Sequence, residues 1–223
     1  MSTILEPGQI EASASAPPFL YLPPHTLFTL RAQRLEQVGH GHPLADYLML
    51  IASLCRVQQS LMDQPPSAII PDPEHVLLCQ QHGLPPLAAD SLVREDGWQP
   101  YLDALLLRYQ APPQPPVQNA LATLRNASAG QRRAWAIALL SGQFEGVPAA
   151  LVPFLGAALQ AAWSHWLLHM PTVDLKPCDS LGQCPACGSP AMAGVIRHRG
   201  KYNGLRYLDR KSTRLNSSHL YDL

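Results

Sequence analysis

The sequence carries little charge and no excess of either sign. Charged side chains make up 14% of the 223 residues, and 16 Lys and Arg residues balance 16 Asp and Glu residues. Proteins that bind nucleic acid through its phosphates normally have an excess of basic residues. The balance therefore disfavours a nucleic-acid-binding protein, and we expect no nucleic acid among the partners.

The N-terminus lacks the features of a secretory leader. The first 19 residues contain no basic segment followed by a continuous apolar stretch. The chain has five cysteines, and an odd number disfavours the disulfide framework of a small secreted protein. These two absences predict a cytoplasmic protein.

No Asp, Glu, Lys or Arg occurs between residues 146 and 173, so this stretch resembles a membrane span in length. It is built largely from Ala, whose side chain gains little free energy on transfer from water into a membrane. It also carries several polar side chains, among them Gln160, Ser164, His165 and His169. We expect a buried or groove-facing helix here and no membrane span.

Apolar residues make up 47% of the chain and recur with helical spacing from residue 26 to about residue 170. The 23 prolines cluster between the periodic segments, where they end or begin helices. This pattern predicts an all-helical domain of six or seven helices, with residues 65–90 largely irregular. The expected helices cover residues 26–39, 43–64, 73–80, 98–109, 116–126 and 128–142, and a further helix begins near residue 148.

The composition of the sequence changes after residue 171, where Gly, Cys and Pro become frequent. Alternating patterns over residues 192–198 and 205–208 predict two short strands, with the turn pair Asn203-Gly204 between them. A Cys pair followed by a short hairpin is typical of the opening of a zinc ribbon.

That Cys pair is Cys184-Pro185-Ala186-Cys187, followed by Gly188. Two cysteines at this spacing can direct both thiolates at one tetrahedral metal ion, and the glycine permits the tight turn of a metal knuckle. A thioredoxin-type redox pair needs its cysteines at a helix N-terminus, which Gly188 and Pro190 disfavour. We favour a metal knuckle with Cys184 and Cys187 as ligands; a redox pair and an inert turn remain as alternatives.

A tetrahedral site needs two further ligands, and the sequence offers no clear ones. We interpret Cys178 as a loop thiol, Cys55 and Cys79 as small buried residues of the helical domain, and His198 as an exposed hairpin residue. No second Cys-x-x-Cys follows residue 208.

The last 15 residues differ from everything before them. Residues 209–219 match the translation of a common sequencing adapter, so we interpret residues 209–223 as an artefactual tail. The expected organisation is a flexible arm at residues 1–24, an all-helical domain at 25–172 and the first part of a metal ribbon at 173–208.

For three other groups of residues we favour a structural role over a binding or catalytic one. His40 and His42 suit the capping of a helix end. Arg94, Glu95 and Asp96 read as a solvated helix start, and Trp163 and Trp166 as core residues.

Five segments in combination resemble the bacterial formate dehydrogenase accessory proteins called FdhE. They are "LRAQRLEQVGHGHPLADYL", "REDGWQPYLDALL", "PAALVPFLGAALQAAWSHW", "CPACGSPAMAGVI" and "GLRYL", and the resemblance covers roughly residues 24–208.

The resemblance implies a mainly helical protein followed by rubredoxin-like ribbon modules that bind iron or zinc. It also implies a non-enzymatic, chaperone-like factor that contacts the catalytic subunit of formate dehydrogenase in the cytoplasm. Of the family's Cys pairs this chain has the first alone, so we expect its metal site to be incomplete. A thiol-disulfide oxidoreductase and a zinc-ribbon nucleic-acid-binding protein are the alternative functions.

Overall fold

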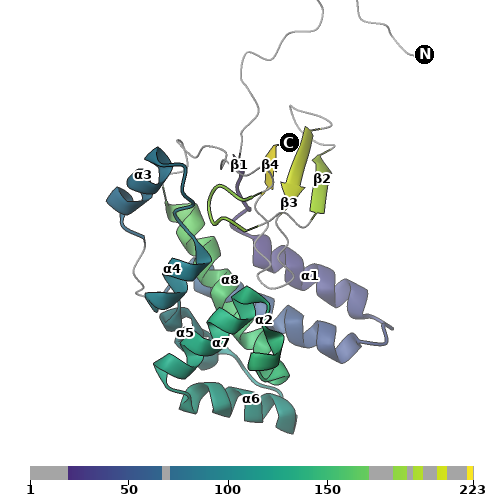
Figure 1. The fold of residues 1–223 in the computed structure, drawn as a ribbon. Helices are drawn as coiled ribbons and strands as arrows, with labels where there is room; N and C mark the ends of the chain where they lie inside the picture. The colour runs from purple at the N-terminus through teal and green to yellow at the C-terminus, as the bar shows by residue number, and fades with distance from the viewer. Residues whose placement is uncertain are drawn as a thin grey trace, which may run out of the picture.

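The computed structural model describes residues 20–66, 71–170, 183–189, 193–197, 205–209 and 220–222. Within these residues, α-helices build the body of the molecule and four short strands form a sheet beside one end of it (Figure 1). The mainly helical fold that the sequence predicts is confirmed.

The helices lie close to their predicted positions, with one addition. The additional helix, α4, has six residues, too few for an apolar period to be visible in the sequence. The elements are α1 (Leu27–Gly39), α2 (Ala45–Asp63), α3 (Pro73–Gln81), α4 (Ala89–Arg94), α5 (Gln99–Arg108), α6 (Pro115–Asn126), α7 (Ala129–Ser141), the short 3-10 helices η1 (Phe144–Gly146) and η2 (Ala149–Leu151), and α8 (Val152–His169).

Helix α8 forms the centre of the core. Thirteen of its 18 residues are buried, including Trp163 and Trp166, as the sequence predicts. It packs against α2 and α5, and Figure 1 shows it passing through the middle of the helical body. The absence of charge in this segment therefore reflects burial among other helices.

Arginine side chains bind the carboxyl ends of two helices. Arg108 donates to the carbonyl oxygens of Ser60 and Gln64, at 2.7 and 2.9 Å, where α2 ends. Arg132 donates to the carbonyl oxygen of Leu124, at 2.9 Å, in the last turn of α6. The carbonyl groups of a last helical turn have few partners within their own helix, so these arginines add hydrogen bonds to them from a neighbouring helix; the Ser60 carbonyl oxygen also accepts the Gln64 N–H at 3.0 Å.

The turn between α4 and α5 places Asp96 differently from the prediction. Arg94 is the last residue of α4, and Asp96 adopts a φ of 58°, so the residues 94–96 do not form a solvated helix start. Asp96 forms an ion pair with Arg133 of α7. The hydrogen bond from Arg133 lowers the pKa of the Asp96 carboxyl group.

Four strands form an antiparallel sheet in the order β1-β4-β3-β2. The hairpin of β2 (Ala193–Arg197) and β3 (Leu205–Asp209) confirms the two short strands that the sequence predicts. Strand β1 (Leu20–Tyr21) lies within the predicted arm, and β4 (Leu220–Asp222) lies within the predicted tail.

Candidate functional site

Residues 184–188, which we call the knuckle, form a closed turn. The backbone N–H groups of Cys187 and Gly188 donate to the carbonyl oxygen of Cys184, at 3.3 and 2.8 Å. The N–H of Cys184 donates to the carbonyl oxygen of Ser189 at 2.9 Å. Gly188 has a φ of 72°, a left-handed conformation that explains why a glycine follows the second cysteine.

The knuckle packs on the helical body through residues 84–87, which we call the strap. The N–H of Leu87 donates to the carbonyl oxygen of Ala186 at 2.6 Å. The carbonyl oxygen of Leu87 in turn accepts the indole N–H of Trp163, on α8, at 3.0 Å. The knuckle is thus linked to the central helix through one residue of the strap.

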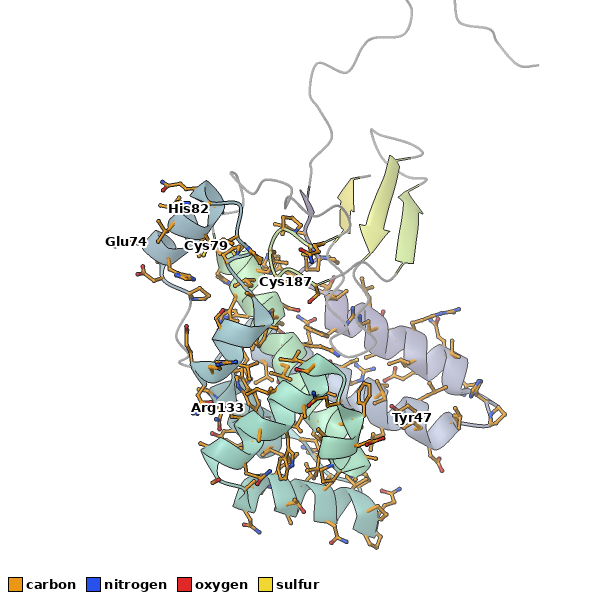
Figure 2. All side chains as sticks on the ribbon, viewed as in Figure 1. Tyr47, Glu74, Cys79, His82, Arg133 and Cys187 are labelled. Atoms are coloured by element: carbon orange, nitrogen blue, oxygen red, sulfur yellow. The ribbon has the colours of Figure 1, made fainter. Side chains whose placement is uncertain are left out.

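Both cysteines of the knuckle are buried. Cys184 is 0% exposed and Cys187 is 3% exposed, and together with Ala186 they belong to the same hydrophobic cluster as the helical core. Figure 2 shows Cys187 beside the end of α8, between the helices and the sheet. Neither thiol is presented to solvent as the nucleophile of an open redox site would be.

Described residues 183–189 contain a turn and no helix. A redox pair of the thioredoxin type gains its low thiol pKa from the N-terminus of a helix that begins at the pair. The local structure therefore disfavours a thioredoxin-type redox pair, while the metal knuckle and the inert turn both remain compatible with it.

The part of the chain that the structure describes does not contain a complete set of metal ligands. Within that part, no group of three or more His, Cys, Asp or Glu side chains is close enough together to hold a metal ion. Cys184 and Cys187 have the ligand type and spacing of one half of a tetrahedral thiolate site, and a structural zinc or iron site needs four ligands. The candidate residues Cys178 and His198 lie outside the described residues.

The other two described cysteines are core residues, as predicted. Cys55 packs against Phe28 and Ala32, and burial raises the pKa of its thiol to about 11, an effect that Arg31 partly opposes. Cys79 is 8% exposed and lies 3.4 Å from Nε2 of His75, one turn earlier on α3. Burial raises the pKa of the Cys79 thiol as well, so neither thiol is activated.

His42 caps a helix, although at the opposite end from the one the sequence suggested. Its Nδ1 atom accepts the backbone N–H of Leu44 at 3.1 Å, where α2 begins, instead of binding carbonyl groups at the end of α1. His40 is exposed beside it. The contact with Leu44 therefore gives His42 a structural role.

The sequence analysis missed a buried polar cluster between α5 and α8. Tyr101 and His165 are in hydrogen-bond contact, and Trp166 packs edge-on against the Tyr101 ring. The rings of His165 and His169 lie 4.2 Å apart. The presence of His165 in an otherwise apolar helix could have indicated a buried hydrogen bond. Its partner, Tyr101, lies 64 residues away in the sequence, so no local pattern identifies it.

A groove of about 490 Å³ opens on the surface between α2 and the connection from α5 to α6. Tyr47 and Met49 line it and are 53% and 42% exposed. Figure 2 shows Tyr47 on the opposite side of the helical body from Arg133. Exposed aromatic and Met side chains around a groove are typical of protein-binding surfaces.

One helical stretch of the described residues, Ala149–His169, is long and apolar enough to cross a membrane by length and composition. In this structure 78% of the most apolar 18-residue window of that stretch is buried inside the protein, as expected for a core helix.

Comparisons with known proteins agree on one family. The model described as "FdhE, N-terminal" matches residues 16–180, and the model described as "FdhE, central domain" matches residues 183–209. A protein named "Protein FdhE homolog" from Pseudomonas putida is 62% identical over 208 residues, which cover 93% of this chain and 65% of that protein. Its counterpart from Pseudomonas aeruginosa is 59% identical, over 92% of this chain and 67% of that protein.

A solved structure has the same fold. The crystal structure of the FdhE protein from Pseudomonas aeruginosa superposes with a TM-score of 0.82 at 52% identity, over 93% of this chain and 70% of that one. The chain spans about two thirds of the length of these relatives.

Proposed function

Because the chain belongs to the FdhE family, whose two successive models match its helical body and its knuckle, we propose that it is a maturation factor for formate dehydrogenase and not an enzyme. The observation that carries the proposal is the match to FdhE relatives along more than nine tenths of the chain. Burial of the described Cys pair disfavours the alternative function, a thiol-disulfide oxidoreductase, because its thiols would have to reach a substrate.

The partner we propose is the catalytic subunit of formate dehydrogenase, which the protein would bind in the cytoplasm. The helical body offers most of the described surface for this contact. Its groove beside Tyr47 combines exposed apolar side chains with a hollow, which suits an apolar segment of a partner protein.

We further propose that Cys184 and Cys187 contribute two thiolates to an iron or zinc site that is complete in the longer family members. Such a metal would hold a small ribbon module together, since a module of this size has little core of its own. The donor type and the Cys-x-x-Cys spacing support this role, and the two described thiolates do not form a complete site alone.

A co-purification experiment tests the proposal. The full-length gene is expressed with an affinity tag together with the catalytic subunit, under reducing and anaerobic conditions, and bound protein is identified by mass spectrometry. We expect the catalytic subunit to co-purify. If circular dichroism shows that the tagged protein is folded and the catalytic subunit is still absent from the purified sample, the result would count against the proposed function.

Two charge-introducing variants locate the contact. Tyr47→Glu places a charge at the groove, and Leu107→Glu places one at an 86% exposed position of α5 as the matched control. We expect Tyr47→Glu to reduce co-purification and Leu107→Glu to leave it unchanged. The reverse result would place the interface away from the groove.

A further inference from the structure

The groove beside Tyr47, which we call the Tyr47 groove, has one wall that is neither helix nor strand. This wall is the segment of residues 109–114 that connects α5 to α6. Tyr109 and Gln114, at its two ends, have extended backbone conformations, with ψ values of 116° and 125°. Two adjacent prolines in the segment restrict φ, and a residue that precedes a proline favours an extended conformation. The conformational freedom of this wall is therefore reduced before any partner binds.

The same wall carries polar groups that are not used within the chain. The side-chain amides of Gln110 and Gln114 line the groove, and neither forms a hydrogen bond with another described residue. The backbone N–H and carbonyl groups of Gln110 and Ala111 also have no hydrogen-bond partner among the described residues. A side-chain amide offers both donors and an acceptor. These groups match the backbone of an extended peptide, whose N–H and carbonyl groups need hydrogen-bond partners when they leave water.

The opposite wall, on α2, adds one charge and an aromatic ring. Asp46 is the single charged side chain among the described residues that line the groove. It is exposed, and it forms no ion pair with another described residue. Tyr47 follows it in the sequence, and the face of an aromatic ring attracts a cation. A carboxylate beside an exposed ring therefore favours a positively charged group on the partner.

We propose that the Tyr47 groove binds an extended segment of a partner protein that carries one Lys or Arg side chain among apolar side chains. The basic side chain pairs with Asp46, and the apolar side chains contact Tyr47 and Met49. The free amides of the 109–114 wall hydrogen-bond the backbone of the segment. The identity of the partner rests on the proposed function, whereas the chemistry of the segment follows from the groove.

Other occupants satisfy the groove less well. A helical segment has its backbone groups already paired, so it gains little from the free amides of Gln110 and Gln114. An acidic segment is repelled by Asp46. A purely apolar ligand covers the amides and the carboxylate without giving them partners, which costs free energy. An extended, apolar segment with one basic residue meets all three requirements.

Selection from a peptide library tests the proposal. A phage-displayed library of random peptides is selected on the immobilised, purified chain, after removal of the peptides that bind the Asp46→Lys variant. We expect the enriched sequences to share one Lys or Arg among apolar residues. No formate dehydrogenase is present in this experiment, so its failure is distinguishable from failure of the co-purification that tests the proposed function.

Fluorescence anisotropy with one enriched peptide then measures the effect of Asp46. We expect Asp46→Asn, which keeps the size of the side chain, to weaken binding about tenfold, because a charged hydrogen-bond partner is lost. The matched control is Glu74→Gln, since Glu74 likewise lies in the first turn of its helix, α3. Figure 2 shows Glu74 on the opposite side of the molecule from Tyr47, and its substitution should leave the affinity unchanged.

A change in the peptide completes the test. Replacing its basic residue by glutamine should weaken binding to the wild-type chain by a similar factor and should have little further effect on the Asp46→Asn variant. The proposal is overturned if no sequence is enriched, if the enriched sequences lack a basic residue, or if Asp46→Asn and Glu74→Gln weaken binding equally. A dimer in sedimentation velocity that Tyr47→Glu abolishes would assign the groove to a second copy of the chain and would also overturn it.

Discussion

The hydroxyl oxygen of Tyr101 lies 2.5 Å from Nδ1 of His165, inside the core between α5 and α8. The two side chains are 0% and 4% exposed. Burial, together with the smaller effect of the neighbouring His169, lowers the pKa of His165 to about 4. The imidazole ring is therefore neutral near pH 7, and a neutral ring can accept the hydroxyl hydrogen at Nδ1.

This pair predicts a pH-dependent stability. The pKa of His165 is about 4 in the folded chain and near 6.5 when unfolded, so the unfolded state binds the extra proton first as the pH falls. The contribution of His165 to the free energy of unfolding should be constant above pH 6.5. Between pH 6.5 and pH 4 this contribution should decrease by about 3 kcal/mol. Urea unfolding, followed by circular dichroism at a series of pH values, measures this decrease.

The control for that decrease is His165→Gln, which cannot take up a proton. Its stability should be lower at pH 7.5, but it should lose most of the slope between pH 6.5 and pH 4. An unchanged slope would mean that another group is responsible.

Gln58→Ala should destabilise the protein by about 2 kcal/mol. Gln58 is 2% exposed, and its amide N–H group donates to the carbonyl oxygen of Ala157 and to Oε1 of Gln160, at 2.9 and 3.0 Å. The substitution removes both hydrogen bonds between α2 and α8 and leaves a cavity. Chemical denaturation measures the change, and Gln37→Ala, at an exposed position of α1, should stay within about 0.5 kcal/mol.

Arg108→Met should shorten or loosen the end of α2. The variant keeps the apolar stem but loses the guanidinium group that binds the carbonyl oxygens of Ser60 and Gln64. We expect a loss of about 1–2 kcal/mol, and faster amide hydrogen exchange in the last turn of α2. Arg94→Met, at an exposed position, is the comparison; equal effects of the two substitutions would contradict the capping role.

The chain as given should bind metal weakly. Two thiolates alone do not satisfy a tetrahedral ion, and a Co²⁺ titration should give no saturable thiolate-to-cobalt absorption at micromolar concentrations. The same titration on a longer family member should saturate, and Cys184→Ser should weaken it there. Tight stoichiometric binding by the present chain would show that two further ligands exist within it.

The sequence predicted the parts of the fold that depend on local chemistry. Pro residues and the apolar period located seven of the helices, and Ser128 and Gly142 flank α7 as its caps. The turn at Gly188 follows from the glycine after the second cysteine. In each case the neighbours in sequence are also the neighbours in space.

What the sequence did not predict depends on distant pairs. The contacts of Gln58 with Ala157 and of Leu87 with Ala186 join residues 99 positions apart. The ion pair of Asp96 with Arg133 likewise joins the turn after α4 to the separate helix α7. No local pattern identifies such partners, and so the sequence located the Cys pair without indicating that it lies in the helical core.

The burial of the knuckle has a consequence for dividing the protein into fragments. The two family matches meet between residues 180 and 183, which suggests a place to cut. A fragment that ended there would leave the Leu87 N–H without its acceptor and would uncover apolar side chains that Cys184 and Ala186 now shield. Such a fragment would tend to aggregate, so the shortest helical piece suitable for crystallisation or binding assays should extend through residue 189.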